Sequence, residues 1–147
     1  MSLLVSMAEA VGALLKERNE TIAIAESSTG GLISAALLAV PGASAYFVGG
    51  GVIYTQTARG ALLDIDLESQ PGMRPSTEPY ALLLANAARG HLGATWGVGE
   101  TGASGPSGNR YGDQPGHSCI AVCGLTSRAI TIETGQSDRE DNMWRFA

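Results

Sequence analysis

Residues 21–25, TIAIA, followed directly by residues 26–31, ESSTGG, decide the fold of this chain. The first five residues are apolar on both faces, which predicts a strand buried inside a layered sheet. Apolar residues then recur at helical spacing over residues 32–40, so the polar turn joins a buried strand to a helix. Open α/β sheets bind ligands at the carboxyl ends of their strands, and we expect Ser27 at such an end.

The turn at residues 26–31 carries groups that suit a bound molecule. Glycines 30 and 31 let the backbone approach a ligand, and the N–H groups of the first helical turn favour negative charge or a developing oxyanion. Ser27 therefore has the position of a nucleophile at a strand–turn–helix junction. A turn serine that only caps the helix is the other interpretation, and position alone leaves both open.

Length and composition predict one globular domain, residues 1–147. The chain is 44% hydrophobic and 16% charged, and its net charge of −5 argues against a nucleic-acid-binding surface. No apolar run approaches the ~20 residues of a membrane span, and the first residues lack the basic segment and cleavage site of a signal peptide. Two cysteines in a chain of this size indicate a reduced, cytoplasmic setting. We expect neither nucleic acid nor a membrane as a partner.

Helical and strand patterns follow one another along the chain. We expect helices at residues 4–19, 30–40, 55–63, 76–92 and 137–147, and strands at residues 21–25, 47–54, 95–99, 117–123 and 128–133. The last two strands form an antiparallel hairpin around Gly124, whereas residues 99–116 are expected to be a long glycine- and proline-rich loop. This order predicts an α/β fold with helices on both faces of a mixed sheet.

Tyr54 and Arg59 are the next candidates for chemistry. Tyr54 ends the expected strand 47–54, and it shares a rim with Ser27 if this strand neighbours the first. A tyrosine hydroxyl can relay a proton, and a nearby cation would favour its ionised form. The alternatives are an amphipathic rim residue for Tyr54 and a solvated helix charge for Arg59.

A phosphate loop and a metal site are less well supported. Residues 100–108, ETGASGPSG, could cradle a phosphate with backbone N–H groups, but no Gly-Lys-Ser/Thr follows as in a P-loop. His91 and His117 form no ligand cluster, and Cys119 and Cys123 share one strand face as core residues. We therefore expect no metal and no other cofactor. A serine–histidine–acid triad using His117 stays open, although no motif supports it.

Five ordered motifs together resemble the C-terminal domain of the competence/damage-inducible protein CinA, a family that includes stand-alone nicotinamide-nucleotide amidases. The motifs are residues 25–31 (AESSTGG), 47–54 (FVGGGVIY), 76–79 (STEP), 101–106 (TGASGP) and 137–139 (SDR). The resemblance covers nearly the whole chain and implies a three-layer α/β/α domain with a mixed sheet, which forms a dimer or a higher homo-oligomer. It also implies hydrolysis of the carboxamide of nicotinamide mononucleotide to nicotinate mononucleotide and ammonia.

The resemblance assigns roles by position. Ser27 would be the nucleophile and Tyr54 its proton relay, and Arg59 falls where the family's active amidases carry a lysine as the presumed base. The substrate-binding residues that it implies are Thr29, Gly30, Gly31, Thr101, Gly105 and Arg139. Amide hydrolysis needs an activated hydroxyl, an oxyanion site and a proton donor for the departing ammonia, and these assignments are consistent with that chemistry.

Arg59 is the main departure from the family pattern. Arginine stays protonated in proteins, so it cannot accept the proton of Ser27. Next to Tyr54 it could instead favour a tyrosinate that acts as the base. Residues 109–117 depart as well and add three side chains near the expected pocket: Arg110, Tyr111 and His117.

Three hypotheses follow for the function. The first is a serine amidohydrolase that acts on nicotinamide mononucleotide or a related pyridine nucleotide. The second is a catalytically degenerate domain that binds a nucleotide or a phosphorylated metabolite without hydrolysing it, because Arg59 replaces the lysine. The third is an amidase for a different amide, with Arg110 or His117 resetting specificity. The catalytic assignment needs Ser27, Tyr54 and Arg59 to meet in one pocket.

Overall fold

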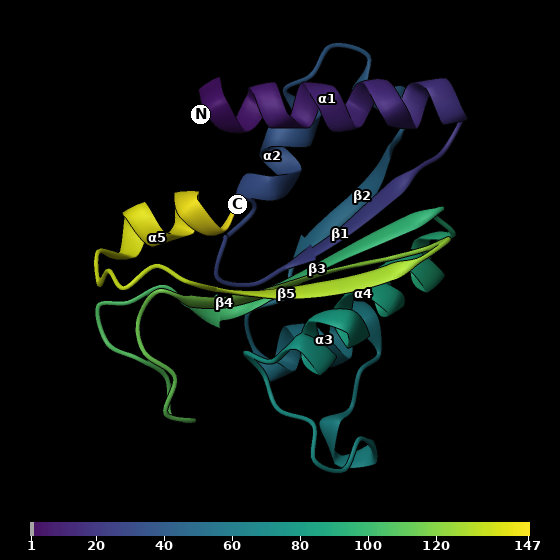
Figure 1. The fold of residues 1–147 in the computed structure, drawn as a ribbon. Coiled ribbons are helices and arrows are strands. Elements are labelled where there is room, and N and C mark those ends of the chain that lie inside the picture. Colours follow the sequence, from purple (N-terminus) through teal and green to yellow (C-terminus); the bar gives the residue numbers. More distant parts are fainter. Residues whose placement is uncertain (1) are drawn as a thin grey trace.

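A five-stranded mixed sheet forms the centre of the computed structural model, which describes residues 2–147 (Figure 1). The strands are β1 (Ile22–Glu26), β2 (Phe47–Val52), β3 (Trp96–Ala103), β4 (His117–Cys123) and β5 (Ser127–Glu133). They lie in the order β2-β1-β3-β4-β5. β2, β1 and β3 run parallel, whereas β4 is antiparallel to both β3 and β5. The parallel half of the sheet therefore brings three carboxyl ends to one edge.

Helices cover both faces of this sheet (Figure 1). The helices are α1 (Ser2–Arg18), α2 (Leu32–Leu38), α3 (Gln56–Leu63), α4 (Glu78–Leu92) and α5 (Arg139–Phe146), with short 3₁₀ turns at Ala43–Ala45 and Leu67–Ser69. α1 and α2 lie on one face, α3 and α4 lie on the other, and α5 lies at one end of the sheet. The predicted α/β fold, a three-layer α/β/α sandwich with a mixed sheet, is confirmed. Over residues 2–147, none of the helices combines the length and apolar character required to cross a membrane.

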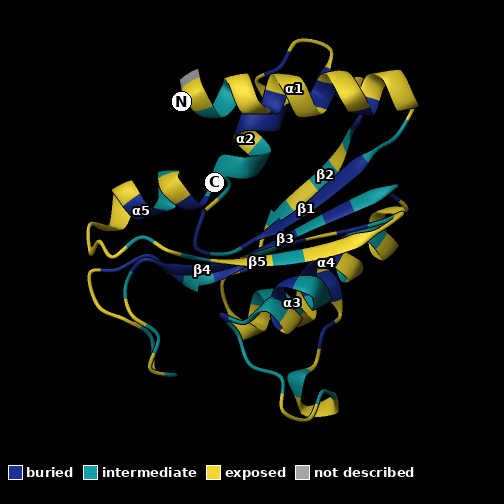
Figure 2. Cartoon of the chain, viewed as in Figure 1, coloured by how far each residue is buried: buried dark blue, intermediate teal, exposed yellow. Residues whose placement is uncertain are grey.

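Small residues let the layers approach closely in the middle of the sheet. All five residues of β1 are buried, and the strand is dark blue in Figure 2. At Gly97 and Gly99 of β3, an added Cβ would collide with the carbonyl oxygens of Ala85 and Ala81 in α4. Glycine at these two positions therefore lets α4 lie directly on β3.

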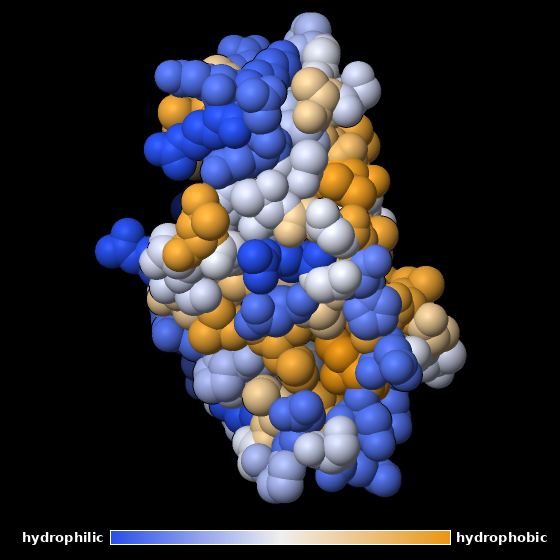
Figure 3. Space-filling model, turned by 90° about the vertical axis from the view of Figure 1, so that its right-hand side faces the viewer, coloured by the Kyte–Doolittle hydropathy of each residue, from blue (hydrophilic) through white to orange (hydrophobic). Residues whose placement is uncertain are grey.

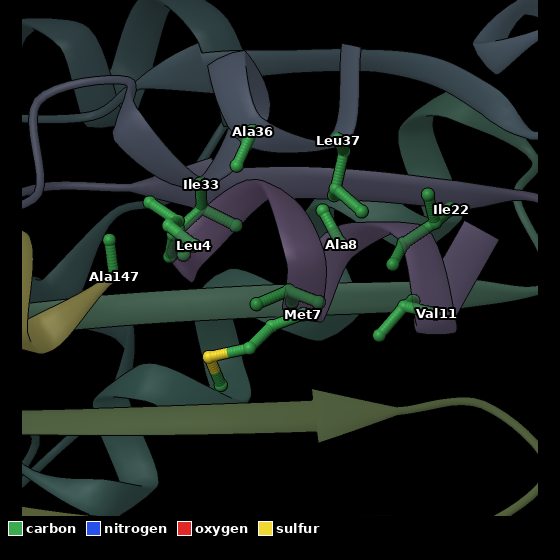
Figure 4. Close-up of a pocket in the computed structure, with 10 residues that line it drawn as sticks. Leu4, Met7, Ala8, Val11, Ile22, Ile33, Ala36, Leu37 and Ala147 are labelled. Carbon is green, nitrogen blue, oxygen red and sulfur yellow. The ribbon is translucent and has the colours of Figure 1, made fainter. Parts of the chain in front are cut away.

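One apolar stripe fastens α1 to the rest of the molecule. Ala8 and Leu15 of α1 belong to the same buried cluster as Ile24 of β1 and Leu37 of α2. Figure 4 shows the Met7 side chain extending away from α2, on the other side of this contact. α1 is thus the amphipathic helix that the sequence predicted, with a second apolar stripe that this contact leaves uncovered.

The prediction of a loop at residues 99–116 is wrong for the first of these residues, because they belong to a strand. β3 continues to Ala103 and pairs with β4 as far as His117. The glycines that suggested a loop are required by packing, because an added Cβ at Gly102 would collide with the His117 carbonyl oxygen. Glycine in this strand therefore marks a close backbone approach and not a chain break.

Three predicted element ends also shift. α2 starts at Leu32 because residues 27–31 form the turn. β2 ends at Val52, so Tyr54 lies two residues beyond the strand. α5 starts at Arg139 and not at residue 137, because Asp138 caps it: the Asp138 Oδ1 accepts a hydrogen bond from the Asp141 N–H at 2.8 Å.

Candidate active site

The candidate site lies at the edge of the sheet where the three parallel strands end. Ser27 follows β1 directly, Tyr54 lies two residues after β2, and Gly105 lies two residues after β3. Because β1 lies between β2 and β3, the turn that starts at Ser27 is flanked by the other two segments. The sequence prediction that Ser27 and Tyr54 share a rim is consistent with this order.

A buried carboxylate holds the turn that carries Ser27. Glu100 of β3 has no exposed surface, and its Oε1 accepts hydrogen bonds from the Ser27 N–H at 3.0 Å and the Thr29 N–H at 2.9 Å. Its Oε2 accepts from the hydroxyls of Ser28 and Ser118. The backbone N–H groups of Ser27 and Thr29 are therefore taken by the chain's own Glu100.

A second buried carboxylate joins the same turn to α2. Glu26 accepts hydrogen bonds from the backbone N–H groups of Ile33 at 3.1 Å and Ser34 at 2.9 Å. The Thr29 hydroxyl lies 2.6 Å from Glu26 Oε1 and 2.9 Å from Glu100 Oε1, and Thr29 is completely buried. Thr29 therefore shapes the turn from inside, and its hydroxyl is enclosed by the two carboxylates.

Arg139 crosses the end of the sheet and joins two of its strands. Its Nη2 donates to the Tyr54 hydroxyl at 3.1 Å, and its Nη1 donates to the Gly105 carbonyl oxygen at 2.5 Å. Tyr54 belongs to the segment after β2 and Gly105 to the segment after β3, so the guanidinium spans the end of β1. The cation beside Tyr54 is therefore Arg139, which only the resemblance placed in the site.

α5 is fixed against the same edge of the sheet. The buried side-chain amide of Asn142 donates to the Ser104 carbonyl oxygen at 2.7 Å. Gly30 and Gly105 have φ of +62° and +115°, and an added Cβ would lie 2.9 Å from the Met143 methyl group and 2.5 Å from the Ser137 carbonyl oxygen, respectively. These glycines let the chain before α5, and α5 itself, close over the rim. Gly31, with φ of +103°, forms the other half of the turn.

Arg59 lies in a different environment from the one expected for a catalytic cation. Its Nη1 donates to the Tyr80 hydroxyl at 3.1 Å, and its guanidinium carbon lies 5.7 Å from the centre of the Tyr80 ring. Its Nε is buried without a hydrogen-bond partner among the residues that the structure describes. The structure thus pairs Arg59 with α4 through Tyr80, and Tyr54 with α5 through Arg139.

Thr101 is buried at 2% exposure, and its hydroxyl oxygen accepts a hydrogen bond from the Ser76 N–H at 3.0 Å. Its direct contact is therefore with the residue just before the α4 cap.

Sequence reasoning missed three residues of this site: Glu100, Ser118 and Asn142. The available signal was Glu100, the only charged residue in segment 93–106. Among residues 2–147, no three His, Cys, Asp or Glu side chains are grouped so as to hold a metal ion.

Comparisons with known proteins agree with this architecture. The family model of the CinA C-terminal domain matches residues 4–147. A CinA-like protein of Chlorobium limicola is 38% identical over 148 residues, which cover 97% of this chain and 34% of the relative. A CinA-like protein of Prochlorococcus marinus is 42% identical over 121 residues, which cover 81% of this chain and 28% of the relative. The chain thus spans about a third of the length of the curated relatives that it matches.

Solved structures show the same fold. A competence-damaged protein (CinA) superfamily protein from Escherichia coli has a TM-score of 0.90 at 22% identity, over 97% of this chain and 83% of that chain. The competence/damage inducible protein CihA from Agrobacterium tumefaciens has a TM-score of 0.88 at 25% identity, over 97% of this chain and 87% of that chain.

The fold and the rim define an α/β domain with a polar site where its parallel strands end. Together with the family match over residues 4–147, they show that this chain belongs to the CinA C-terminal domain family.

Proposed function

We propose that this chain is a serine-dependent amidohydrolase that converts nicotinamide mononucleotide to nicotinate mononucleotide and ammonia. The observation that carries the proposal is the position of Arg139, which links Tyr54 to Gly105 across the end of the strand that Ser27 follows. A nucleophile, a hydroxyl and a cation then lie at the same end of the sheet. Amide hydrolysis requires this set of groups.

The proposed reaction assigns one task to each group. The Ser27 oxygen attacks the carboxamide carbon while the Ser27 proton passes through the Tyr54 hydroxyl to the departing nitrogen, so that the C–N bond breaks and ammonia leaves. Water then hydrolyses the acyl–Ser27 ester and releases the carboxylate. Because the Tyr54 oxygen accepts its hydrogen bond from Arg139, its own O–H proton is free to be donated to the leaving group.

The turn around Ser27 is preorganised for this task. Glu100 and Glu26 fix it through backbone N–H groups and hydroxyls, so that little reorganisation accompanies attack. Since Glu100 occupies the Ser27 and Thr29 N–H groups, Arg139 is the donor that we assign to the developing oxyanion.

Ammonia release from nicotinamide mononucleotide tests the proposal directly. We expect the purified chain to release ammonia and a Ser27→Ala variant to release none above background. Ser44→Ala, which removes an exposed serine from the 3₁₀ turn Ala43–Ala45, is the matched control and should keep full activity. Equal release by the parent and the Ser27→Ala variant would overturn the role of Ser27.

A domain that binds the nucleotide without hydrolysing it is the second candidate. The position of Arg59 favours it, because the residue that replaces the family lysine is bonded to Tyr80 and supplies no base to Ser27. Binding of the nucleotide by calorimetry without ammonia release would support this candidate. A large gain of activity in Arg59→Lys would show that the native site is degenerate, and a panel of free amides in the same assay would reveal a different substrate.

We also propose that the chain acts in the cytoplasm. Cys119 and Cys123 are both free and buried, and burial raises the pKa of each thiol. Unpaired thiols that are kept protonated fit a reducing compartment.

We further propose that two copies of this chain pair through an apolar surface, here called the open face. It consists of the outward stripe of α1 and the uncovered side of β4 and β5, with exposed side chains at Leu3, Met7, Val11, Leu14, Val122 and Ile130. A groove of about 630 Å³ runs between α1, α5 and these two strands, and a second of about 360 Å³ continues along α1 toward β3. Figure 3 shows the end of the molecule toward which α1 runs, where hydrophilic surface lies at the top and apolar surface gathers below it and along the right-hand edge.

Shape, area and charge favour a second copy as the occupant of the open face. The face combines a ridge, α1, with a flat sheet surface, so a two-fold axis can place each ridge on the other copy's sheet. It leaves six large apolar side chains between 36% and 75% exposed, and an exposed apolar area of this kind marks a protein–protein interaction site. Both ends of the grooves carry one acid and one base, Glu20 with Arg18 and Asp141 with Arg145, so the rims of two copies do not repel each other.

Sedimentation of the purified chain tests this pairing. We expect a dimer at micromolar concentration and a monomer when Met7→Glu and Ile130→Glu are combined. Leu62→Glu is the control, because it adds a glutamate at an exposed leucine of α3, on the opposite face of the sheet, and should leave the dimer intact. A parent chain that sediments as a monomer would overturn the proposal.

A further inference from the structure

His117, the first residue of β4, has both ring nitrogens against hydrogen-bond acceptors. Nδ1 lies 2.5 Å from Oε1 of Glu133 on β5, and Nε2 lies 2.8 Å from the carbonyl oxygen of Ser76. A neutral imidazole has one N–H group, so it can donate to only one of these acceptors. The doubly protonated imidazolium satisfies both of these hydrogen bonds at once, on a residue that is only 8% exposed.

Negative groups outnumber positive ones around this ring. The titratable and charged groups that face it are Glu133 of β5, Cys119 of β4, Asp113 and Arg74 of the two loops, and Glu78 of α4, which reaches Cys119 through Thr131. Arg74 is bound to Asp113 at 2.8 Å and is the one cation of the group. Burial alone would lower the pKa of His117, but the hydrogen bonds to Glu133 and the Ser76 carbonyl, with the charge of Asp113, raise it above its ordinary value.

A short covalent and hydrogen-bonded path connects His117 to the candidate site. Ser76 accepts from His117 through its carbonyl oxygen and donates through its N–H to the Thr101 hydroxyl. Ser76 is buried with a φ of +63°, a strained conformation for a serine that its surroundings have to maintain. Thr101 follows Glu100, the carboxylate that holds the Ser27 turn.

The same imidazolium is tied to the loop that leaves the site at Gly105. Asp113 of this loop lies 3.8 Å from His117 Nε2 and also bonds Arg74, just before Ser76. The loop returns to β4 through Gly116, whose N–H donates to the Ala103 carbonyl oxygen at 2.8 Å. His117 is therefore the point where β4, β5, the Ser76 turn and the 105–116 loop are joined.

We propose that protonated His117 is a positioning residue that holds the Ser76 turn and the 105–116 loop against the site, so that ligand binding weakens as His117 loses its proton. The loss of one N–H leaves either the buried Ser76 carbonyl or the Glu133 carboxylate without its donor. This inference rests on the proposed function only for the identity of the ligand, a pyridine nucleotide.

The sign of the pH dependence follows from the raised pKa. The contribution of His117 to stability and to the shape of the site is complete below the ordinary histidine value of about 6.5 and is lost as pH rises through the folded-state value. His91, the other histidine of the chain, is exposed and, among the described residues, hydrogen-bonds only the Ala87 carbonyl oxygen through Nδ1, so it serves as the internal control.

Calorimetric binding of nicotinamide mononucleotide from pH 6.5 to 9.5, in the Ser27→Ala background to prevent turnover, tests the proposal. Over this pH range, we expect the affinity of the Ser27→Ala variant to fall roughly tenfold more than the affinity of the variant that combines Ser27→Ala with His117→Gln. Comparing the two variants cancels the effect of titrating the ligand itself. His91→Gln should reproduce the profile of the Ser27→Ala background. Parallel profiles with and without His117→Gln would overturn the proposal.

Two further measurements keep the test decisive. In ring-proton NMR of the unmodified chain, His117 should titrate with a midpoint above the ordinary histidine value, and the amide signals of Ser76 and Thr101 should shift with the same midpoint. Glu133→Gln, which changes a partly exposed partner and threatens folding less, should move that midpoint to lower pH. If no nucleotide binds at any pH, the ligand assignment fails, while the positioning role stands or falls on whether the Ser76 and Thr101 signals follow His117.

Discussion

Two arginine–tyrosine pairs in this molecule share one hydrogen-bond geometry and differ in their surroundings. Arg139 bonds the Tyr54 hydroxyl, and Arg59 bonds the Tyr80 hydroxyl, each at 3.1 Å. Tyr54 is 60% exposed, whereas Tyr80 is 2% exposed. The first pair therefore faces molecules that arrive from solvent, and the second joins α3 to α4 inside the protein.

Burial decides what each hydroxyl can do. It raises the pKa of Tyr80, and the hydrogen bond and charge of Arg59 act in the opposite direction without cancelling this effect. Tyr80 consequently keeps its proton over the working pH range and contributes packing and one internal hydrogen bond. Tyr54 has the same chemistry at an open rim, beside the Ser27 turn, where a proton can be exchanged with a substrate.

Removing the two hydroxyls separately should produce the largest contrast. We expect Tyr54→Phe to lower kcat for ammonia release by roughly 10²–10⁴-fold, because a positioned proton donor contributes this much. Tyr80→Phe should leave kcat within about threefold, since its hydroxyl does not reach the rim. Equal losses in the two variants would show that the comparison misplaces the catalytic hydroxyl.

The next largest effect should come from the geometry of Arg139. Its two Nη atoms reach Tyr54 and Gly105 at once, which the single ammonium of a lysine cannot reproduce. We expect Arg139→Lys to reduce kcat/KM by roughly 10–100-fold, in line with the loss of one hydrogen bond to a charged group.

Arg145→Lys is the matched control for Arg139→Lys. Arg145 lies on the same helix, is exposed, and pairs only with Asp141 at 2.7 Å among the described residues. An exposed pair of this kind contributes little, so kcat/KM should stay at the parent value. A comparable loss in Arg145→Lys would mean that α5 is disturbed as a whole and that Arg139 has no specific role.

The partners of these arginines mark the limit of what the sequence could predict. Tyr54 and Arg59 lie five residues apart, which made them the natural pair in sequence. Their actual partners lie 85 residues away for Tyr54 and 21 residues away for Arg59, and tertiary packing selects both. Spacing along the chain does not indicate toward which neighbouring element a side chain of α3 points.

The fold was more accessible than the site, for a physical reason. Apolar periodicity and helix caps are local signals, so the elements and their layers were predicted nearly in full. The exception is instructive: Gly102 was taken as a loop residue, although neighbouring backbone requires glycine there. Glu100 was missed because its partners, the N–H groups of Ser27 and Thr29, lie about 70 residues earlier in the chain.

A stability measurement should show what the buried pair contributes. Arg59→Met keeps most of the stem and removes the hydrogen bond and the ring contact with Tyr80. We expect a loss of about 1 kcal/mol in the free energy of unfolding. The loss stays this small because the substitution also removes the Nε, which is buried without a partner among the described residues, and this gain offsets part of the cost. Urea unfolding gives the loss, and ammonia release should be unchanged. A collapse of activity in a folded Arg59→Met variant would return Arg59 to the catalytic site.

The smallest expected effect is the coupling between Arg59 and Tyr80. Tyr80→Phe removes only the hydroxyl, leaves the ring packed in its buried cluster, and should cost about 1 kcal/mol in urea unfolding. In a double-mutant cycle with Arg59→Met, the loss of stability in the double variant should fall short of the sum of the two single losses by roughly 0.5–1 kcal/mol, since both substitutions delete the same hydrogen bond. Strict additivity would mean that the coupling free energy between Arg59 and Tyr80 is zero. In that case the packing of α4 would hold Tyr80 in place without help from Arg59.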